Sequence, residues 1–219
     1  MATLAPAARD VLVRILKASE SAITECVSAL KEGRIIAYPT ETVYGLGVDA
    51  TNKEALKKLF QVKKRDETKP SSVAVSGIEK AKGIAIFSKI AEALAKRFLP
   101  GPLTLVVPAI VPMPLISLDG KVGIRIPSNE FSQQLLRNFP NPITATSANI
   151  SGQESVTRAA DLDKTLLDRI DIAVDAAESK YKQGSTVVEV LDSNYKILRE
   201  GAITKEAIMK AAEDLFTNT

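Results

Sequence analysis

Two kinds of hydrophobic pattern alternate along this chain. Short apolar runs rich in β-branched residues are typical of buried strands, and apolar residues spaced three or four apart are typical of amphipathic helices. The predicted strands cover residues 11–17, 35–38, 73–75, 103–107, 122–126, 143–145, 172–174, 186–190 and 196–198. The predicted helices cover the segment from Ser19 or Ser21 to before Gly33, then 51–65, 88–98, about 130–138, about 162–170 and the segment from about Thr204.

Strands that alternate with helices indicate an α/β fold. Asp192-Ser193-Asn194 has the composition of a hairpin turn, so some neighbouring strands are predicted to be antiparallel and the sheet to be mixed. Thr51-Asn52-Lys53-Glu54 has the spacing of a capping box and predicts a helix start. The 219 residues fit a single domain, and 45% hydrophobic residues suffice for its core.

Charge and reactive residues narrow the possible functions. The 29 Lys and Arg against 26 Asp and Glu give a formal charge of +3, too small to indicate a nucleic-acid-binding protein by itself. The lone Cys26 excludes an internal disulfide and lies on an apolar helix stripe. Since the chain has no histidine, Ser/His and Cys/His nucleophile pairs are excluded. No apolar run reaches the roughly 20 residues of a membrane span, so we expect a cytoplasmic protein.

The second predicted strand runs into a loop that is dense with hydroxyl groups and glycines, and binding sites are often built at such junctions. In an extended chain alternate side chains share a face, so Thr40 and Thr42 should point together at a small polar ligand while Glu41 points away. Gly45 and Gly47 would let the backbone pass close to that ligand. The alternative is a solvent-facing turn, because turn residues also gather at strand ends.

The densest cationic cluster is Lys63-Lys64-Arg65 with nearby Lys69. Cations in a last helical turn also complement the helix dipole, so a purely structural role is the alternative here. Arg125 lies within an otherwise apolar strand, where an unpaired charge would be costly, and it must therefore reach a cavity or a salt-bridge partner. The sequence has no P-loop and no complete GxGxxG motif.

These segments together resemble the YrdC-domain family, whose characterised members are threonylcarbamoyl-AMP synthases acting in tRNA modification. The resemblance runs from about residue 21 to 215, after an N-terminal extension at 1–20 that contains the first strand. The matching elements follow the family's order, and they are the 33–47 loop, Lys63-x-Arg65 with Lys69-Pro70, Ser147-Ala148-Asn149, Ser185-Thr186-Val187-Val188 and Arg199-x-Gly201-x-Ile203.

The resemblance implies a YrdC-like twisted mixed β-sheet with flanking helices beside a concave, positively lined cavity. It also implies which residues contact the substrates. L-Threonine would be held by Thr40, Thr42, Arg125, Ala145 and Ser185. ATP would be held by Lys63, Arg65, Lys69, Lys121, Ser147, Asn149, Ser155 and Arg199. Lys63 and Arg65 would be the catalytic cations that stabilise the departing pyrophosphate.

The activity implied by the resemblance is synthesis of threonylcarbamoyl-AMP from L-threonine, bicarbonate or CO2, and ATP. Mg2+ would accompany ATP without a metal site of the protein's own, and a tRNA threonylcarbamoyl transferase would receive the product. Two departures from the family pattern stand out. Lys121 replaces an expected threonine, and Ala74 or Ser76 lies where some members have a histidine.

Other functions remain open at this point. A non-catalytic RNA-binding module could use basic loops to grip phosphates, although aromatic residues are only 5% of the chain. A carbamoyl-transfer role in hydrogenase maturation would use the same domain type inside a longer protein. We expect this chain to lack the additional C-terminal domain of longer relatives, and direct contact with tRNA is possible.

Overall fold

The computed structural model describes residues 13–217, in which the strands form two mixed β-sheets. The first sheet has five strands in the order β1 (Arg14–Lys17), β10 (Ile172–Asp175), β2 (Ile36–Tyr38), β3 (Gly45–Gly47) and β9 (Thr146–Ser147). β1, β10 and β2 are parallel, whereas β3 pairs antiparallel with β2 and β9. The loop expected to contain Gly45 and Gly47 is therefore partly a strand.

The second sheet is larger and contains the longest strands. Its order is β12 (Asn194–Arg199), β11 (Thr186–Leu191), β5 (Leu103–Pro108), β7 (Lys121–Arg125), β4 (Val73–Ala74) and β8 (Ile143–Thr144), with β6 (Ser117–Leu118) paired to β7. The predicted hairpin at 192–194 is confirmed, since Leu191 pairs with Asn194 across the β11–β12 turn. β8 belongs to this sheet and β9 to the first, so the chain passes from one sheet to the other at Ala145.

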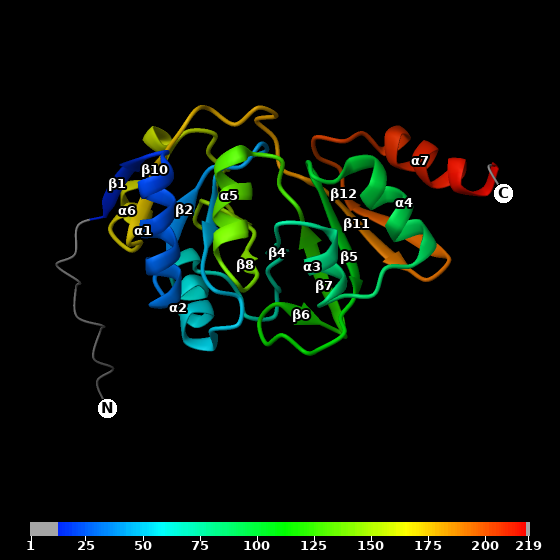
Figure 1. Cartoon of the computed structure of the whole chain (residues 1–219), viewed down its shortest axis with the longest axis horizontal. Helices are drawn as coiled ribbons and strands as arrows, with labels where there is room; N and C mark the ends of the chain where they lie inside the picture. The colour runs from blue at the N-terminus through cyan, green and yellow to red at the C-terminus, as the bar shows by residue number, and fades with distance from the viewer. Residues whose placement is uncertain (1–12, 218–219) are drawn as a thin grey trace.

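Helices cover both sheets (Figure 1). They are α1 (Glu20–Lys31), α2 (Lys53–Lys63), α3 (Ile78–Lys82), α4 (Lys89–Phe98), α5 (Glu130–Asn138), α6 (Lys164–Leu167) and α7 (Lys205–Thr217), with a 3-10 turn at Ala159–Asp161. In Figure 1, α1, α2 and α6 accompany the first sheet, and α4 and α7 lie together beside β5, β11 and β12. The mixed α/β class predicted from sequence is confirmed, with the strands divided between two sheets.

The alternation of side chains along β2 explains how the first sheet is buried on both faces. Ile36 and Tyr38 pack into a cluster with the apolar faces of α1 and α5, while Ala37 points to the opposite face and joins the larger core. Cys26 lies in the α1–α5 cluster and is fully buried, and burial raises the pKa of its thiol to about 12. The cysteine is therefore a structural apolar residue.

Two helix starts illustrate the local signals. Ser19 caps α1 by accepting a hydrogen bond from Ala22 N. The prediction that Thr51 opens the second helix was wrong by one residue. Asn52 is the cap, and its Oδ1 accepts from the backbone N–H of Glu54 and of Ala55. Thr51 is instead held by Asp49, whose Oδ1 accepts from both Thr51 N and Oγ1.

Other predicted elements differ mainly in length. The helix expected at 162–170 is the short α6. Of the strand expected at 11–17, β1 covers Arg14–Lys17, residue 13 lies before it, and 11 and 12 lie outside the described residues. α3 was not predicted. Among the described helices, none is long and apolar enough to cross a membrane.

Candidate functional site

A cavity of about 260 Å³ opens between the two sheets. Strands β2, β3 and β9 of the first sheet and β5, β7, β11 and β12 of the second contribute to its walls. Three arginines line it, namely Arg65, Arg125 and Arg199, and no residue found in its lining carries a carboxylate. Hydroxyl groups of Thr40, Thr104, Ser147, Ser155 and Ser185 also belong to the lining. This combination suits an anionic ligand with several oxygen atoms.

Arg125 is the most buried of these arginines, at 7% exposure. It ends β7, and its Nη2 donates hydrogen bonds to Glu41 Oε1 at 2.9 Å, to Thr40 Oγ1 at 3.3 Å and to Thr42 Oγ1. Its Nε is buried and has no hydrogen-bond partner among residues 13–217. A buried donor without a partner costs free energy, and because Nε has almost no accessible surface, a ligand would reach Arg125 only through its other cavity-lining atoms.

Thr40 and Thr42 lie together as predicted, but only Thr40 reaches the cavity lining. Their Oγ1 atoms lie 2.9 Å apart, and Thr40 lines the cavity while Thr42 is buried behind it. The prediction that Glu41 points away was wrong. The backbone bends at residues 41–43 instead of remaining extended, so the Glu41 carboxylate also turns toward Arg125 and forms a buried salt bridge with it.

A second polar group lies on the opposite wall. Arg199 donates to the backbone carbonyl of Ser185 at 2.8 Å, and Ser185 Oγ lies 2.8 Å from Thr104 Oγ1. Desolvation and, secondarily, the charge of Arg125 lower the pKa of Arg199. A Cβ on Gly201 would lie 2.2 Å from the carbonyl oxygen of Gly184, so the Arg-x-Gly motif needs glycine for close backbone packing.

Arg65 reaches the cavity because α2 ends at Lys63, two residues before it. Lys64 has φ of 49° and turns the chain in the left-handed conformation. Arg65 then donates to the carbonyls of Lys69 and Pro70, both at 2.8 Å, and its guanidinium lies 6.0 Å from the Phe60 ring centre. Desolvation lowers the pKa of Arg65. The phosphate contact predicted for it is compatible with this position.

Lys63 occupies a different environment from Arg65. Its side chain is 1% exposed and is not among the cavity-lining residues. The Nζ donates to the backbone carbonyl of Ser147, to that of Asn149 at 2.7 Å and to Asn149 Oδ1 at 3.3 Å. Burial, with a smaller effect of the Arg65 charge, lowers the pKa of Lys63 to about 7. Lys63 therefore supports the loop that forms one cavity wall.

That loop carries the predicted Ser-Ala-Asn motif. Ala145 and Ser147 line the cavity, and Ser155 lies at its exposed margin. Asn149 does not line it. The Asn149 Oδ1 accepts a 2.5 Å hydrogen bond from Ser147 Oγ, so it orients the serine from behind.

Two predicted ATP contacts lie away from the cavity. Lys69 is exposed and contributes its backbone carbonyl to Arg65. Lys121 begins β7, at the opposite end from Arg125, and its Nζ forms a 2.8 Å ion pair with Glu189. Neither side chain is among the lining residues, and the position of Lys121 argues against direct nucleotide contact.

The glycines of β3 also differ from their predicted role. Gly45 lines the cavity, but a Cβ on Gly47 would lie 3.1 Å from the Tyr38 ring. Close packing against Tyr38 therefore accounts for Gly47, which does not line the cavity, whereas Gly45 keeps the position predicted for a ligand approach. The wall residues that sequence analysis missed include Tyr38, Tyr44, Ser72 and Thr104. A lone threonine within the apolar run 103–107 is the only sequence signal among them.

No group of three or more acidic or cysteine side chains in the part of the chain that the structure describes could hold a metal ion. The chain therefore offers arginines, hydroxyls and backbone groups for chemistry at this cavity.

The chain is similar to several known proteins. The Sua5/YciO/YrdC family model, described as "Telomere recombination", matches residues 28–201. The threonylcarbamoyl-AMP synthase of Pyrococcus abyssi is 35% identical over 189 residues, which are 85% of this chain and 56% of that protein. The putative threonylcarbamoyl-AMP synthase of Methanocaldococcus jannaschii is 32% identical over 199 residues, which are 89% of this chain and 95% of that protein.

A solved structure of P. abyssi Sua5 complexed with L-threonine has a TM-score of 0.84 and 34% identity to this chain. The match covers 92% of this chain and 60% of that one. This chain thus spans little more than half the length of its P. abyssi relative.

Proposed function

The chain belongs to the Sua5/YciO/YrdC family, and on this premise we propose that it is an enzyme that makes threonylcarbamoyl-AMP for tRNA modification. Its substrates are L-threonine, CO2 or bicarbonate, and ATP, and its second product is pyrophosphate. The observation that carries the proposal is the cavity lined by Arg65, Arg125 and Arg199, with no carboxylate found among its lining residues. The relative solved with L-threonine supports the choice of amino acid.

The wall around Arg125 binds the amino acid. The Arg125 guanidinium donates to the threonine carboxylate, with Thr40 and Thr42 beside the same guanidinium. Ser185 and the backbone of Ala145 complete the threonine contacts from the second sheet and from the crossing between the sheets.

Arg65 and the Ser147 loop bind the nucleotide. Arg65 contacts the phosphates, and Ser147, Ser155 and Arg199 hold other parts of ATP. Lys63 contributes by fixing the loop that presents Ser147. Because Lys69 and Lys121 do not line the cavity, they are not required for this arrangement.

The reaction proceeds by nucleotidyl transfer. The threonine nitrogen uses its lone pair to form a C–N bond with CO2, and its proton passes to solvent. A carbamate oxygen then attacks the α-phosphorus of ATP in line, and the bond to pyrophosphate breaks. The protein orients the two substrates and supplies positive charge, so no histidine base is needed.

Mg2+ fits this site as part of the nucleotide complex. The residues found in the cavity lining include hydroxyls but no carboxylates. An ion held by phosphates and water needs no protein carboxylate, and it would neutralise charge on the pyrophosphate. A tRNA threonylcarbamoyl transferase is the proposed recipient of the product, in the cytoplasm. Direct tRNA contact is not needed for this step.

An omission experiment tests the proposed function. Pyrophosphate release is measured with ATP and Mg2+ while L-threonine and bicarbonate are each added or omitted. Release that requires both additions supports the proposal. Release without threonine, or none despite a folded protein, contradicts it, and salt-sensitive RNA binding without turnover would favour the RNA-binding alternative.

A further inference from the structure

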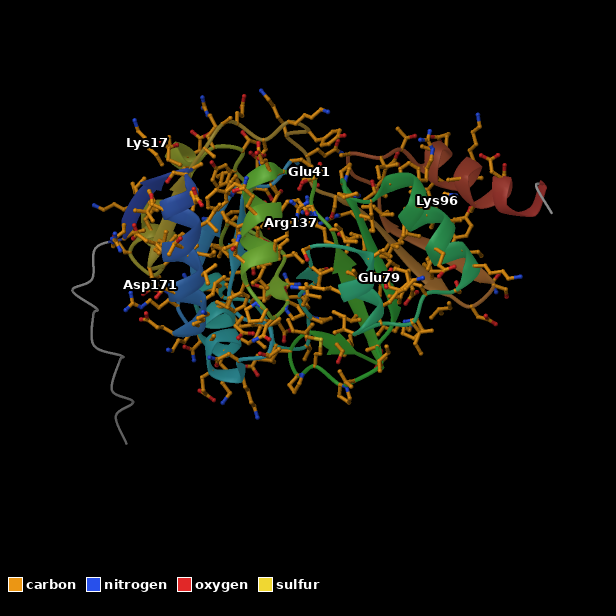
Figure 2. All side chains as sticks on the ribbon, in the orientation of Figure 1. Lys17, Glu41, Glu79, Lys96, Arg137 and Asp171 are labelled. Atoms are coloured by element: carbon orange, nitrogen blue, oxygen red, sulfur yellow. The ribbon has the colours of Figure 1, made fainter. Side chains whose placement is uncertain are left out.

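Glu41 is a buried carboxylate that lies behind the cavity wall. Its side chain is only 4% exposed, and it is not among the lining residues. Figure 2 shows Glu41 at one end of α5. A buried carboxylate is costly unless it has charge and hydrogen-bond partners, so its contacts indicate what it does.

The two carboxylate oxygens contact different elements. Oε1 accepts from Arg125 Nη2 at 2.9 Å. Oε2 accepts from Ser128 N at 2.9 Å and Asn129 N at 3.4 Å, where the chain enters α5. Glu41 thereby ties the guanidinium at the end of β7 to the rigid start of a helix. The backbone carbonyl of Glu41 accepts from Tyr181 N at 2.8 Å, which fixes its loop as well.

This contact fixes the guanidinium of Arg125, which belongs to the cavity lining. The side-chain contacts of Arg125 with Thr40, Glu41 and Thr42 use Nη2, and the buried Nε keeps no partner in the described chain. An arginine side chain has several rotatable bonds, and ordering them costs conformational entropy. If they are fixed before the ligand arrives, binding does not have to include this entropy cost. Since Glu41 does not line the cavity, a ligand need not displace it.

We propose that Glu41 is a positioning residue that holds the Arg125 guanidinium in the cavity wall, in place for the carboxylate of the amino-acid substrate. This inference rests on the proposed function for the identity of the substrate. The claim about the orientation of Arg125 concerns the unliganded protein and can be tested separately.

The kinetic test uses Glu41→Gln, which preserves shape and removes the charge, and Glu41→Asp, which keeps the charge on a shorter chain. Asp49→Asn is the matched control, because Asp49 is also a buried carboxylate that accepts backbone and side-chain hydrogen bonds but does not line the cavity. We expect Glu41→Gln to raise KM for L-threonine about tenfold or more, with KM for ATP nearly unchanged. Glu41→Asp should have a smaller effect and Asp49→Asn none.

An unchanged or lower KM for threonine in a folded Glu41→Gln protein overturns the proposal. A lower value would mean that Glu41 competes with the substrate for Arg125. If Glu41→Gln does not fold, Glu41→Asp carries the same test. Cooperative thermal unfolding monitored by circular dichroism checks folding in each case.

A second readout does not depend on turnover. The NMR signal of Arg125 Nε–Hε, identified by its absence in Arg125→Lys, should shift and broaden in Glu41→Gln but stay in place in Asp49→Asn. An unchanged signal overturns the proposed positioning. If the signal responds as expected but the wild-type protein neither binds threonine nor releases pyrophosphate, the proposed function fails while the positioning of Arg125 by Glu41 stands.

Discussion

Lys63 Nζ donates a hydrogen bond to the backbone carbonyl of Asn149 at 2.7 Å, across 86 positions of sequence. This contact places Lys63 beneath the loop that presents Ser147, while Arg65 faces the cavity. The left-handed turn at Lys64 separates the two cations. The Lys-x-Arg motif therefore contains one structural support and one cavity cation.

Replacement of Lys63 should loosen this loop. Lys63→Met leaves the carbonyls of Ser147 and Asn149 without their donor, and we expect the free energy of unfolding to fall by about 1–3 kcal/mol. KM for ATP should rise because Ser147 is no longer fixed. Urea unfolding and steady-state kinetics measure these effects. Lys64→Met is the control, since Lys64 is exposed, and a loss of stability as large as that of Lys63→Met would contradict the assignment.

The pH dependence of stability provides a test of the buried ammonium. Burial lowers the pKa of Lys63 from 10.5 to about 7, so above that pH the folded state binds fewer protons than the unfolded chain. The free energy of unfolding should therefore rise with pH above 7, by at most about 1.4 kcal/mol per pH unit. Because the pKa of Cys26 is raised from 9.0 to about 12, the contribution of this thiol to the free energy of unfolding falls with pH above 9. Urea unfolding between pH 7 and 9 should show that the free energy of unfolding rises with pH in the wild-type protein and does not rise in Lys63→Met. Equal slopes in the two proteins would contradict the lowered pKa of Lys63.

Arg65 is expected to act mainly on the chemical step. Arg65→Ala removes a cavity guanidinium that can stabilise developing pyrophosphate charge, and kcat should fall roughly 100-fold or more. Arg65→Lys retains charge without the planar fork and should be intermediate. Single-turnover pyrophosphate release measures the effect. A folded Arg65→Ala protein with undiminished turnover would remove Arg65 from the catalytic set.

Arg125 is expected to act on threonine binding. Arg125→Ala would leave Glu41 as an uncompensated buried charge, which costs about 3–5 kcal/mol, so Arg125→Lys is the better variant. The lysine keeps a positive charge near Glu41 but lacks the planar guanidinium. KM for threonine should rise about 10- to 100-fold with little change in KM for ATP, because a charge-assisted hydrogen bond is lost. Unchanged threonine dependence would refute the carboxylate contact.

Lys121 aligns with an ATP-binding position of the family, but in the structure its side chain lies away from the cavity. Since its Nζ pairs with Glu189 outside the cavity, Lys121→Ala should leave KM for ATP within about twofold and reduce stability by no more than about 1 kcal/mol. Steady-state kinetics with varied ATP provide the measurement. A large increase in KM for ATP would show that Lys121 leaves Glu189 to contact the nucleotide.

Most helices and strands could be predicted because apolar spacing and capping residues are signals contained in the segment itself. The apolar spacing and caps of α4 and α5 lie within the helices themselves, and both helices were predicted from sequence. The division into two sheets was not predictable in this way, because it depends on pairings such as β8 with β4 and β9 with β3. Glu41 shows the same limit within the site. Alternation predicted its direction for a straight strand, but the backbone bend and distant Arg125 turned it inward.

The most direct test of threonylcarbamoyl-AMP synthesis follows the carbon of labelled bicarbonate into the product. The purified protein is incubated with carbon-13 bicarbonate, ATP, Mg2+ and L-threonine, and the nucleotides are analysed immediately by mass spectrometry. We predict a labelled threonylcarbamoyl adenylate that appears together with pyrophosphate and disappears when threonine is omitted. Pyrophosphate formation without a labelled adenylate, or an adenylate that forms without threonine, would contradict the account.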